Sequence, residues 1–491
     1  MKNTLKITLA IALALFLLTG CGFTRTNADA SGEAVVTAGA ATLSVEVDAT
    51  VSDRDAAGEY DAAEAVTLDP TGDLTITEAG VYLLSGSYEG MIVIEAGEED
   101  KVQLVLQNAE LSNENGPALY IRSADKVFLT AAEGTVNTIS DGADYSLTDD
   151  ETSLDAAVFS KADLTINGAG ALTITGNYKH AVVSKDDLVV TAKALTVNAA
   201  NVGLDGKDAV KLSEATVSIT AGSDGIRSEN SAEEDRGYIS IVDSSVTIVS
   251  GKDGIQAETA FYAENANLVI TAGGGSGVRS GTESCKGIEA GASVVIDGGS
   301  YQIDAADDAI HANGSVSVSA GSFTLQSGDD GIHANELAEI SGGTLNITAY
   351  EGIEATYIRI SGGEITIAAS DDGINAARKS SAYTPTVEIT GGTVTITMGQ
   401  GDTDGIDSNG TIIITGGTVS VYANSPFDYD GTATFTGGTV YVNGQQVTTL
   451  PNQMMGGGMG GFGGGPGGGP GGQGGFGGGY GGQGGGPGGW R

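Results

Sequence analysis

A short phrase recurs through the second half of the chain and constrains the fold more than any other feature. It consists of an acid, then glycine, then isoleucine, and its isoleucine steps through Ile288, Ile310, Ile332, Ile353 and Ile374 at intervals of 21 or 22 residues. Self-similarity at such a period is typical of a solenoid, in which each repeat stacks on its neighbour. The copies, one with alanine in place of glycine, are Asp224-Gly225-Ile226, Asp253-Gly254-Ile255, Asp308-Ala309-Ile310, Asp330-Gly331-Ile332, Glu351-Gly352-Ile353, Asp372-Gly373-Ile374 and Asp404-Gly405-Ile406.

The remainder of each repeat alternates apolar and polar residues around a Gly-Gly pair, as in 340–348, 360–367 and 389–396. This pattern predicts two short strands around a turn, and the Thr, Val and Ile residues fit a pleated surface. We therefore predict an all-β fold: a right-handed, single-stranded parallel β-helix with coils of about 22 residues over residues 66–450. The alternative, a β-sandwich, would not repeat one phrase at one period.

The chain begins with features of an exported protein. Lys2 and Lys6 precede an apolar run at residues 7–18 that is too short to span a bilayer. The run leads into a Leu-Thr-Gly-Cys sequence ending at Cys21, which looks like the lipobox of bacterial lipoproteins. The alternative is an ordinary signal peptide followed by an unrelated cysteine. We expect a lipid-anchored protein on the extracellular face of the cell membrane, with a lipoprotein signal peptide at 1–20 and a flexible tether at 21–65.

The charge and the composition limit the possible partners. The net charge is −41, and removal of Lys2 and Lys6 with the signal peptide would make it −43. Such an excess of acid excludes nucleic acid and anionic lipid as direct partners, so contact with the membrane is expected only through the lipid on Cys21. Cys285 would then have no internal disulfide partner, and we expect a monomer. The glycine-dominated segment 451–491 is predicted to be a disordered tail.

Acidic residues recur in register with the repeat and form a predicted ladder. Coils of a parallel solenoid stack about 4.8 Å apart, and like charges at such a distance repel by roughly 1 kcal/mol in water and several-fold more near a low-dielectric surface. Calcium suits this ladder because it takes six to eight oxygen ligands from carboxylates, amides and carbonyls. Turn formation by Asp-Gly is the alternative, but it does not explain the doubled acids. The predicted calcium ligands are Asp307, Asp308, Asp329, Asp330, Glu351, Glu354, Asp371, Asp372, Asn375, Asp404 and Asp407.

Two histidines interrupt the ladder. His311 and His333 lie one coil apart, and together they are possible ligands of a transition metal such as zinc. Such a metal usually recruits more histidine or thiolate than this pair offers. Stacked surface imidazoles, or rings that contact a sugar, are equally compatible with the spacing.

Further motifs resemble an exported bacterial carbohydrate-binding domain family over roughly residues 65–445. The motifs are the segments 80–88, 101–107, 116–127 and 133–142, followed by the Asp-Asp-Gly-Ile coils. The resemblance implies an acidic parallel β-helix of the pectate-lyase-like type. It also implies a protein that binds pectic, polygalacturonate-like polysaccharide through calcium and has no established catalysis.

By this resemblance, the calcium ligands are the acids of the repeated turns. They correspond here to Asp308, Asp330, Glu351, Asp372 and Asp404 and their neighbours. Lys286 and Ala309 interrupt the pattern, which argues against an unbroken file of ions.

Two other functions remain open at this point. A calcium-dependent polysaccharide lyase on the same fold would need a cationic base, and Arg378, followed by Lys379 in an inserted turn, is the candidate. A solvated turn is the simpler explanation for these two residues. A surface adhesin or spacer rigidified by calcium is the second alternative, because nothing in the repeat itself requires a glycan.

Overall fold

The computed structural model describes residues 47–68, 72–146, 153–233, 235–278, 281, 283–399 and 403–452. The chain divides into two units, Met1–Met454 and Met455–Arg491, and every described residue belongs to the first. The predicted signal peptide, Cys21 and nearly all of the glycine-rich tail lie outside the described residues. Within the described part, no helix has both the length and the apolar character needed to cross a membrane.

The described residues are almost entirely β-strand, with one short helix, α1 (Asp53–Ala57). The first strands are β1 (Val66–Thr67), β2 (Leu74–Ile76), β3 (Gly80–Glu89), β4 (Ile92–Glu95), β5 (Lys101–Asn113), β6 (Leu119–Ser123), β7 (Lys126–Ala131), β8 (Val136–Asp141), β9 (Ala156–Ser160), β10 (Asp163–Asn167), β11 (Ala171–Gly176), β12 (His180–Ser184), β13 (Asp187–Val190), β14 (Ala194–Ala199), β15 (Leu204–Gly206), β16 (Ala209–Ser213), β17 (Thr216–Ala221), β18 (Ile226–Ser228), β19 (Tyr238–Val242) and β20 (Ser245–Ser250). The remaining strands are β21 (Ile255–Ala257), β22 (Ala260–Ala272), β23 (Ile288–Ala290), β24 (Ser293–Ala305), β25 (Ile310–Ala312), β26 (Ser315–Ser327), β27 (Asp330–Ile340), β28 (Thr344–Ala349), β29 (Glu351–Ile360), β30 (Glu364–Ala369), β31 (Ile374–Ala376), β32 (Thr386–Ile389), β33 (Thr393–Met398), β34 (Asp404–Ser408), β35 (Thr411–Ile414), β36 (Thr418–Tyr422), β37 (Ser425–Tyr429), β38 (Ala433–Phe435), β39 (Thr439–Val442) and β40 (Gln445–Val447).

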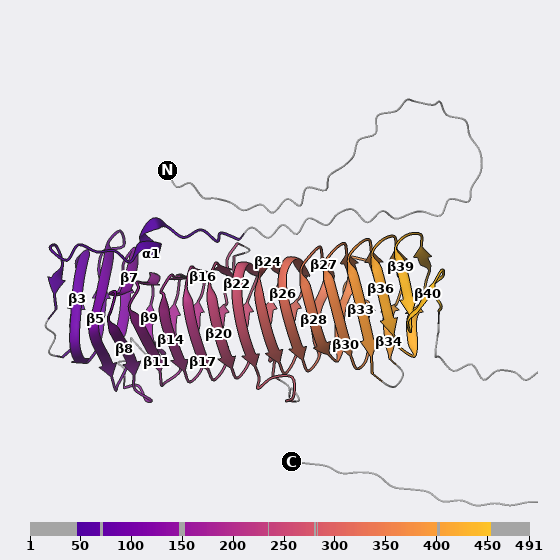
Figure 1. The fold of residues 1–491 in the computed structure, drawn as a ribbon. Coiled ribbons are helices and arrows are strands. Elements are labelled where there is room, and N and C mark those ends of the chain that lie inside the picture. The colour runs from indigo at the N-terminus through magenta and orange to yellow at the C-terminus, as the bar shows by residue number, and fades with distance from the viewer. Residues whose placement is uncertain are drawn as a thin grey trace, which may run out of the picture. The chain divides into compact units, whose positions relative to one another are not determined.

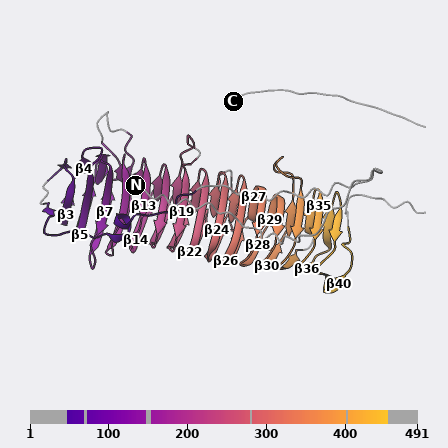
Figure 2. The same ribbon diagram turned by 90° about the horizontal axis from the view of Figure 1, so that it is seen from above.

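Strands of one coil pair in parallel with strands of the next coil. In the described residues the coils are joined by three kinds of ladder, of which β10–β13, β11–β14 and β12–β15 are examples. Figures 1 and 2 show successive strands following one another in chain order along the stack. At the end of the stack, β39 and β40 pair antiparallel. The all-β class predicted from the repeat is confirmed, and the strands pair as that repeat requires.

The isoleucine of the repeated phrase forms a continuous file inside the coils. Ile288 aligns with Ile310, Ile310 with Ile332, Ile332 with Ile353, and Ile353 with Ile374. All five side chains are fully buried, which explains why the sequence keeps this position apolar at every turn. Burial of an isoleucine side chain stabilises the fold by roughly 1.5–3 kcal/mol. Each coil thus supplies the core that its neighbours need.

The glycine of the phrase allows adjacent coils to approach closely. A Cβ atom added to Gly373 would lie 2.5 Å from the carbonyl oxygen of Gly405 and 2.4 Å from Cγ2 of Ile396. Gly352 is equally crowded, because its Cβ would lie 2.3 Å from the carbonyl oxygen of Gly373. Neither glycine has a positive φ, so the requirement comes from contact between coils and not from a left-handed turn.

Part of the segment expected to be a flexible tether packs on the coils. Asp55 of α1 is 4% exposed and forms an ion pair with Lys126 at 2.7 Å. Its backbone carbonyl accepts hydrogen bonds from Asn167 and Thr191. Ser52 caps the helix and also bonds the Asp55 side chain. The description of residues 21–65 as tether therefore fails for this portion, because its buried polar contacts attach it to the side of the stack.

Candidate functional site

The acidic ladder follows the short strands that carry the isoleucine file. Among these strands, β25, β31 and β34 are only three to five residues long. The turn that precedes the strand therefore lies close to the isoleucine file in each coil. The residue after each isoleucine points away from the core. The predicted row of these residues has the expected register: Arg227, Gln256, Glu289, His311, His333, Glu354, Asn375 and Asp407 are aligned from coil to coil. The row extends further than predicted, to Asp205 at one end and Asp428 at the other.

The aspartate before the glycine joins one coil to the next. The Oδ1 atom of Asp308 accepts a hydrogen bond from the backbone N–H of Asp330 at 3.0 Å. Asp372 accepts one from the N–H of Asp404 at 3.2 Å, and Asp224 accepts one from that of Asp253 at 3.3 Å. These acids therefore help to hold neighbouring coils together. This agrees in part with the alternative hypothesis that the aspartates serve the turns and not a cation.

Two groups of three carboxylates lie close enough to share a cation. In the first group, formed by Asp307, Asp308 and Asp329, one oxygen atom from each residue lies within 4.8 Å of the others. Burial, together with Asp308 and Asp307, raises the pKa of Asp329. The carboxylates of this group thus repel one another, although Lys286 Nζ lies 3.1 Å from Asp307 Oδ2 and offsets part of the charge.

The second group consists of Glu351, Asp371 and Asp372, whose ligand atoms also lie within 4.8 Å of one another. Burial first, and then the neighbouring acids, raise the pKa of Glu351 to about 7 and that of Asp372 to about 6. At neutral pH the ionised carboxylates of this group repel one another. A divalent cation would relieve that repulsion.

Asn375 supplies a free acceptor next to the second group. Its amide nitrogen donates to Glu351 at 3.0 Å and to Glu354 at 3.4 Å. Its Oδ1 atom is buried and has no hydrogen-bond partner among the described residues. Buried polar atoms normally have a partner, so this oxygen is available to a ligand. Asp407 is the next residue in the row, and burial, together with Asp372 and Asp404, raises its pKa to about 7. The oxygen-rich donor set of this region fits calcium.

The two histidines interrupt the acidic row at its centre. Their rings stack with centroids 4.6 Å apart and planes 15° apart. His311 Nδ1 lies 2.7 Å from Asp308, and His333 Nδ1 lies 2.6 Å from Asp330 and 3.1 Å from Glu354. Although burial lowers it, hydrogen bonding to these two acids raises the pKa of His333 to about 10. The protonated ring therefore neutralises part of the ladder.

The inserted turn after β31 contributes a cation, but not the one favoured from the sequence. Lys379 Nζ lies 2.7 Å from Glu354, and the backbone N–H groups of Lys379 and Ser380 donate to the hydroxyl of Thr356. Arg378 is exposed. Among the two basic residues of this turn, Lys379 is thus the one that meets the acidic ladder.

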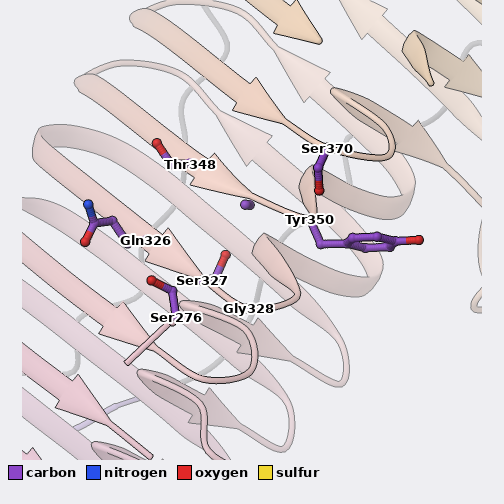
Figure 3. A pocket seen from close by; sticks show the side chains of 8 residues that line it. Ser276, Gln326, Ser327, Gly328, Thr348, Tyr350 and Ser370 are labelled. Atoms are coloured by element: carbon purple, nitrogen blue, oxygen red, sulfur yellow. The ribbon is translucent and has the colours of Figure 1, made fainter. Parts of the chain in front are cut away.

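A polar hollow lies beside the second carboxylate group and was not predicted from the sequence. It measures about 320 Å³, and Figure 3 shows Gln326 and Ser276 on one side of it and Tyr350 and Ser370 on the other. The nearby Asp371 carboxylate raises the pKa of the Tyr350 hydroxyl. The polar turn residues were the only feature of the sequence that could have indicated this hollow. Neither the alternation of apolar and polar residues nor the charge distinguishes them from other surface residues. The remaining lining residues are Ser327, Gly328, Thr348 and Ala349.

Fold and site together define a class: an all-β protein of parallel coils with polar and acidic turns along one edge. The model of a family described as "Carbohydrate-binding domain-containing protein" matches residues 71–331 and 329–448. These matches cover most of the chain, and the chain belongs to this family. The carbohydrate-binding resemblance expected from the motifs is confirmed at this level.

Two individual proteins are similar to parts of the chain. A carbohydrate-binding domain-containing protein of Acetivibrio thermocellus is 33% identical over 129 residues, which is 26% of this chain and 45% of that relative. The chain thus matches less than half of the relative's length. A solved structure described as the polysaccharide lyase-like protein from C. thermocellum, gadolinium derivative, is 30% identical with a TM-score of 0.41, over 43% of this chain and 91% of that one.

Proposed function

We propose that this carbohydrate-binding protein holds acidic, polygalacturonate-like polysaccharide through calcium bound by the stacked turns of its repeat. The observation that carries the proposal is the pair of carboxylate groups, Asp307/Asp308/Asp329 and Glu351/Asp371/Asp372, each with ligand atoms within 4.8 Å. Burial and the neighbouring acids raise the pKa of Glu351 to about 7, which supports a cation at the second group, because a bound cation would favour the ionised carboxylates. In a protein of net charge −41, such clusters are stable only when the repulsion is offset.

Calcium explains how an acidic surface can hold an acidic polymer. When bound, it supplies a positive centre that accepts carboxylate oxygens from the protein and from the sugar. The protein side of such a bridge would be Asp307 and Asp329 at the first group and Glu351 and Asp371 at the second. Asp308 and Asp372 would contribute less, since Oδ1 of each already accepts a backbone hydrogen bond. Several weak sites along one chain of sugar would add by avidity.

The polar hollow provides a place for the uncharged part of a sugar. Gln326, Ser370 and Thr348 line it with amide and hydroxyl groups, which are the partners that sugar hydroxyls need. Tyr350 lines the hollow, and its pKa is raised by Asp371 of the second carboxylate group, so the hollow and this group are neighbours. A uronic acid residue seated there would direct its carboxylate toward the calcium-binding group.

We further propose that this function resides on a right-handed parallel β-helix at the cell surface. The parallel pairing of coils and their repeat of about 22 residues support the solenoid. The Leu-Thr-Gly-Cys sequence before residue 22 supports export and lipidation at Cys21. A lipid anchor would keep the binding surface outside the cell, where polysaccharide is available.

Calorimetric titration of the full chain with polygalacturonate tests the proposal. We expect binding in calcium and none in EDTA, with no rise in absorbance at 235 nm, the wavelength of the unsaturated product of a lyase. Binding that persists in EDTA, or absent binding in both conditions, would contradict calcium-mediated recognition. A rise in absorbance that Arg378→Ala abolishes would show that the protein is a lyase and not only a binding protein. Stabilisation by calcium without polysaccharide binding would indicate a rigidified spacer.

A further inference from the structure

The histidine pair at the centre of the ladder has a donor set different from that of the carboxylate groups. Each imidazole uses Nδ1 for a carboxylate: His311 faces Asp308, and His333 faces Asp330 and Glu354. Metal-binding histidines usually hold a carboxylate or carbonyl at one ring nitrogen, which fixes the ring and leaves the other nitrogen for the metal. Both rings therefore already have the support that a metal ligand requires.

The second ring nitrogens lie on the same side of the stack, each beside an amide oxygen. His311 Nε2 lies 3.2 Å from Asn313 Oδ1, and His333 Nε2 lies 3.3 Å from Asn335 Oδ1. Because the two histidines align in register and their rings are nearly parallel, the two nitrogens and two oxygens form the corners of one small polar patch. The histidine side chains are 13% and 12% exposed, so the patch is accessible to a small ion from solvent.

We propose that Nε2 of His311 and of His333, together with Oδ1 of Asn313 and Asn335, form a binding site for a borderline divalent transition metal such as zinc or copper. Imidazole nitrogen selects these metals, whereas calcium prefers a set made entirely of oxygen. On binding, Nε2 releases its proton to solvent and keeps its carboxylate partner at Nδ1. The rings are nearly parallel with centroids 4.6 Å apart, whereas two metal–nitrogen bonds of about 2.0–2.1 Å allow at most about 4.2 Å between the nitrogens. Both rings must therefore rotate toward one another when they bind one ion.

The ligand atoms of this site differ from those of the proposed polysaccharide binding. Its four ligand atoms belong to none of the carboxylates of the two calcium groups. Asp308, which belongs to the first of those groups, serves here only to orient His311. The presence or absence of a transition-metal site can therefore be decided whether or not calcium carries polysaccharide.

Electron paramagnetic resonance of the full chain with one equivalent of Cu²⁺ tests the assignment, because each bound imidazole splits the copper signal. Every sample carries Cys21→Ser, which removes the thiol of the predicted lipidation site as a competing ligand. We expect splitting from two nitrogens, reduced to one nitrogen in His311→Gln and in His333→Gln. His180→Gln provides a matched control, since His180 is buried in β12 beside Asp155, and it should leave the spectrum unchanged.

The amide ligands are tested separately, in a variant that does not disturb the ladder. Asn313 is exposed and Asn335 is partly exposed, so Asn313→Ala/Asn335→Ala should fold normally. We expect this variant to bind Zn²⁺ at least tenfold more weakly in competition with a chromophoric chelator, with excess calcium present throughout. A copper spectrum with oxygen ligands alone, or one that survives in the His311→Gln/His333→Gln double variant, would overturn the assignment.

Discussion

At the scale of single residues, the acids of the repeated turns perform two tasks that the sequence does not separate. Asp308 and Asp372 accept backbone hydrogen bonds from the next coil, so part of the acidic row holds the stack together. Glu351 and Asp371 accept no such backbone bond in the described structure, and they lie in a group of three carboxylates. Glu351 instead accepts a side-chain hydrogen bond from Asn375 of the next coil. We assign both acids to cation binding because neither has a backbone N–H donor among the described residues and both lie in this carboxylate group.

Glu351→Gln tests this division. The change removes a charge whose pKa burial and neighbouring acids raise to about 7, and it retains an oxygen for Asn375. Without calcium we expect the variant to be more stable than the wild type by about 1 kcal/mol, after discounting for the exposed part of the side chain. With calcium we expect a smaller gain in thermal midpoint than in the wild type.

Glu364→Gln is the matched control for this experiment. Glu364 is exposed on β30, outside both carboxylate groups, and its change should leave the calcium response intact. An equal calcium response in Glu351→Gln and the wild type would contradict the assignment of Glu351.

The sequence predicted the positions of the ladder residues but not their contacts. The period of the isoleucines fixed the register, so the row from Arg227 to Asp407 aligns as expected. Hydrogen bonds depend on rotamers, which spacing does not determine. For that reason the bond from the Asp330 N–H to Asp308, the pairing of Glu354 with Lys379, and the hollow beside Tyr350 appear only in three dimensions.

At the scale of elements, the stacking of coils depends on a glycine that leaves no room for a methyl group. We expect Gly373→Ala to destabilise the protein by about 1–3 kcal/mol, because its Cβ would approach Ile396 and the Gly405 carbonyl too closely. Urea unfolding followed by circular dichroism measures the change. Gly277→Ala is the control, since its Cβ would meet no atom within 4 Å. Equal stability of the two variants would show that the coils can separate at little cost.

The helix α1 is an element that the repeat did not predict. Its short, polar sequence resembles a linker, and its attachment is seen in contacts such as those of Asp55 with Lys126 and Thr165. These contacts join residues more than seventy positions apart in sequence. No local pattern contains that information.

Asp55→Ala should release this element without unfolding the coils. Removing one partner of a buried ion pair costs about 3–5 kcal/mol, and here the loss falls on the attachment of residues 48–57. We expect faster hydrogen exchange in this segment, with unchanged exchange in β24 and β26. Asp53→Ala, a change at an exposed position of the same helix, should have little effect. Uniformly faster exchange in the coils would instead make α1 part of the global folding unit.

At the scale of the whole molecule, the acidic groups make stability depend on pH and on calcium together. Several carboxylates have a folded-state pKa above the usual value, so the folded protein binds protons more tightly than the unfolded chain between about pH 4 and 7. Stability should therefore fall as the pH rises through this window. Burial is the main cause, and these groups include Asp163 and Asp372, with a pKa of about 6, and Glu351 and Asp407, with a pKa of about 7.

Thermal unfolding at pH 5 and pH 7.5 checks this dependence. His333 acts in the same direction, because its raised pKa contributes stability below about pH 6.5 that is lost as the pH rises toward 10. In EDTA we expect a lower midpoint at pH 7.5 than at pH 5. In calcium the difference should shrink, since a bound cation favours the ionised carboxylates. A higher midpoint at pH 7.5 in EDTA would contradict the repulsion described here.

The calcium dependence of the binding constant shows whether calcium joins the carboxylate groups to an acidic polysaccharide. Polygalacturonate is titrated into the full chain at a series of free calcium concentrations. Linkage requires the logarithm of the binding constant to rise with the logarithm of calcium concentration when calcium is taken up on binding. We expect a slope of about one or more in the wild type and a smaller slope in Glu351→Gln/Asp371→Asn. A slope of zero in the wild type would contradict calcium-mediated binding.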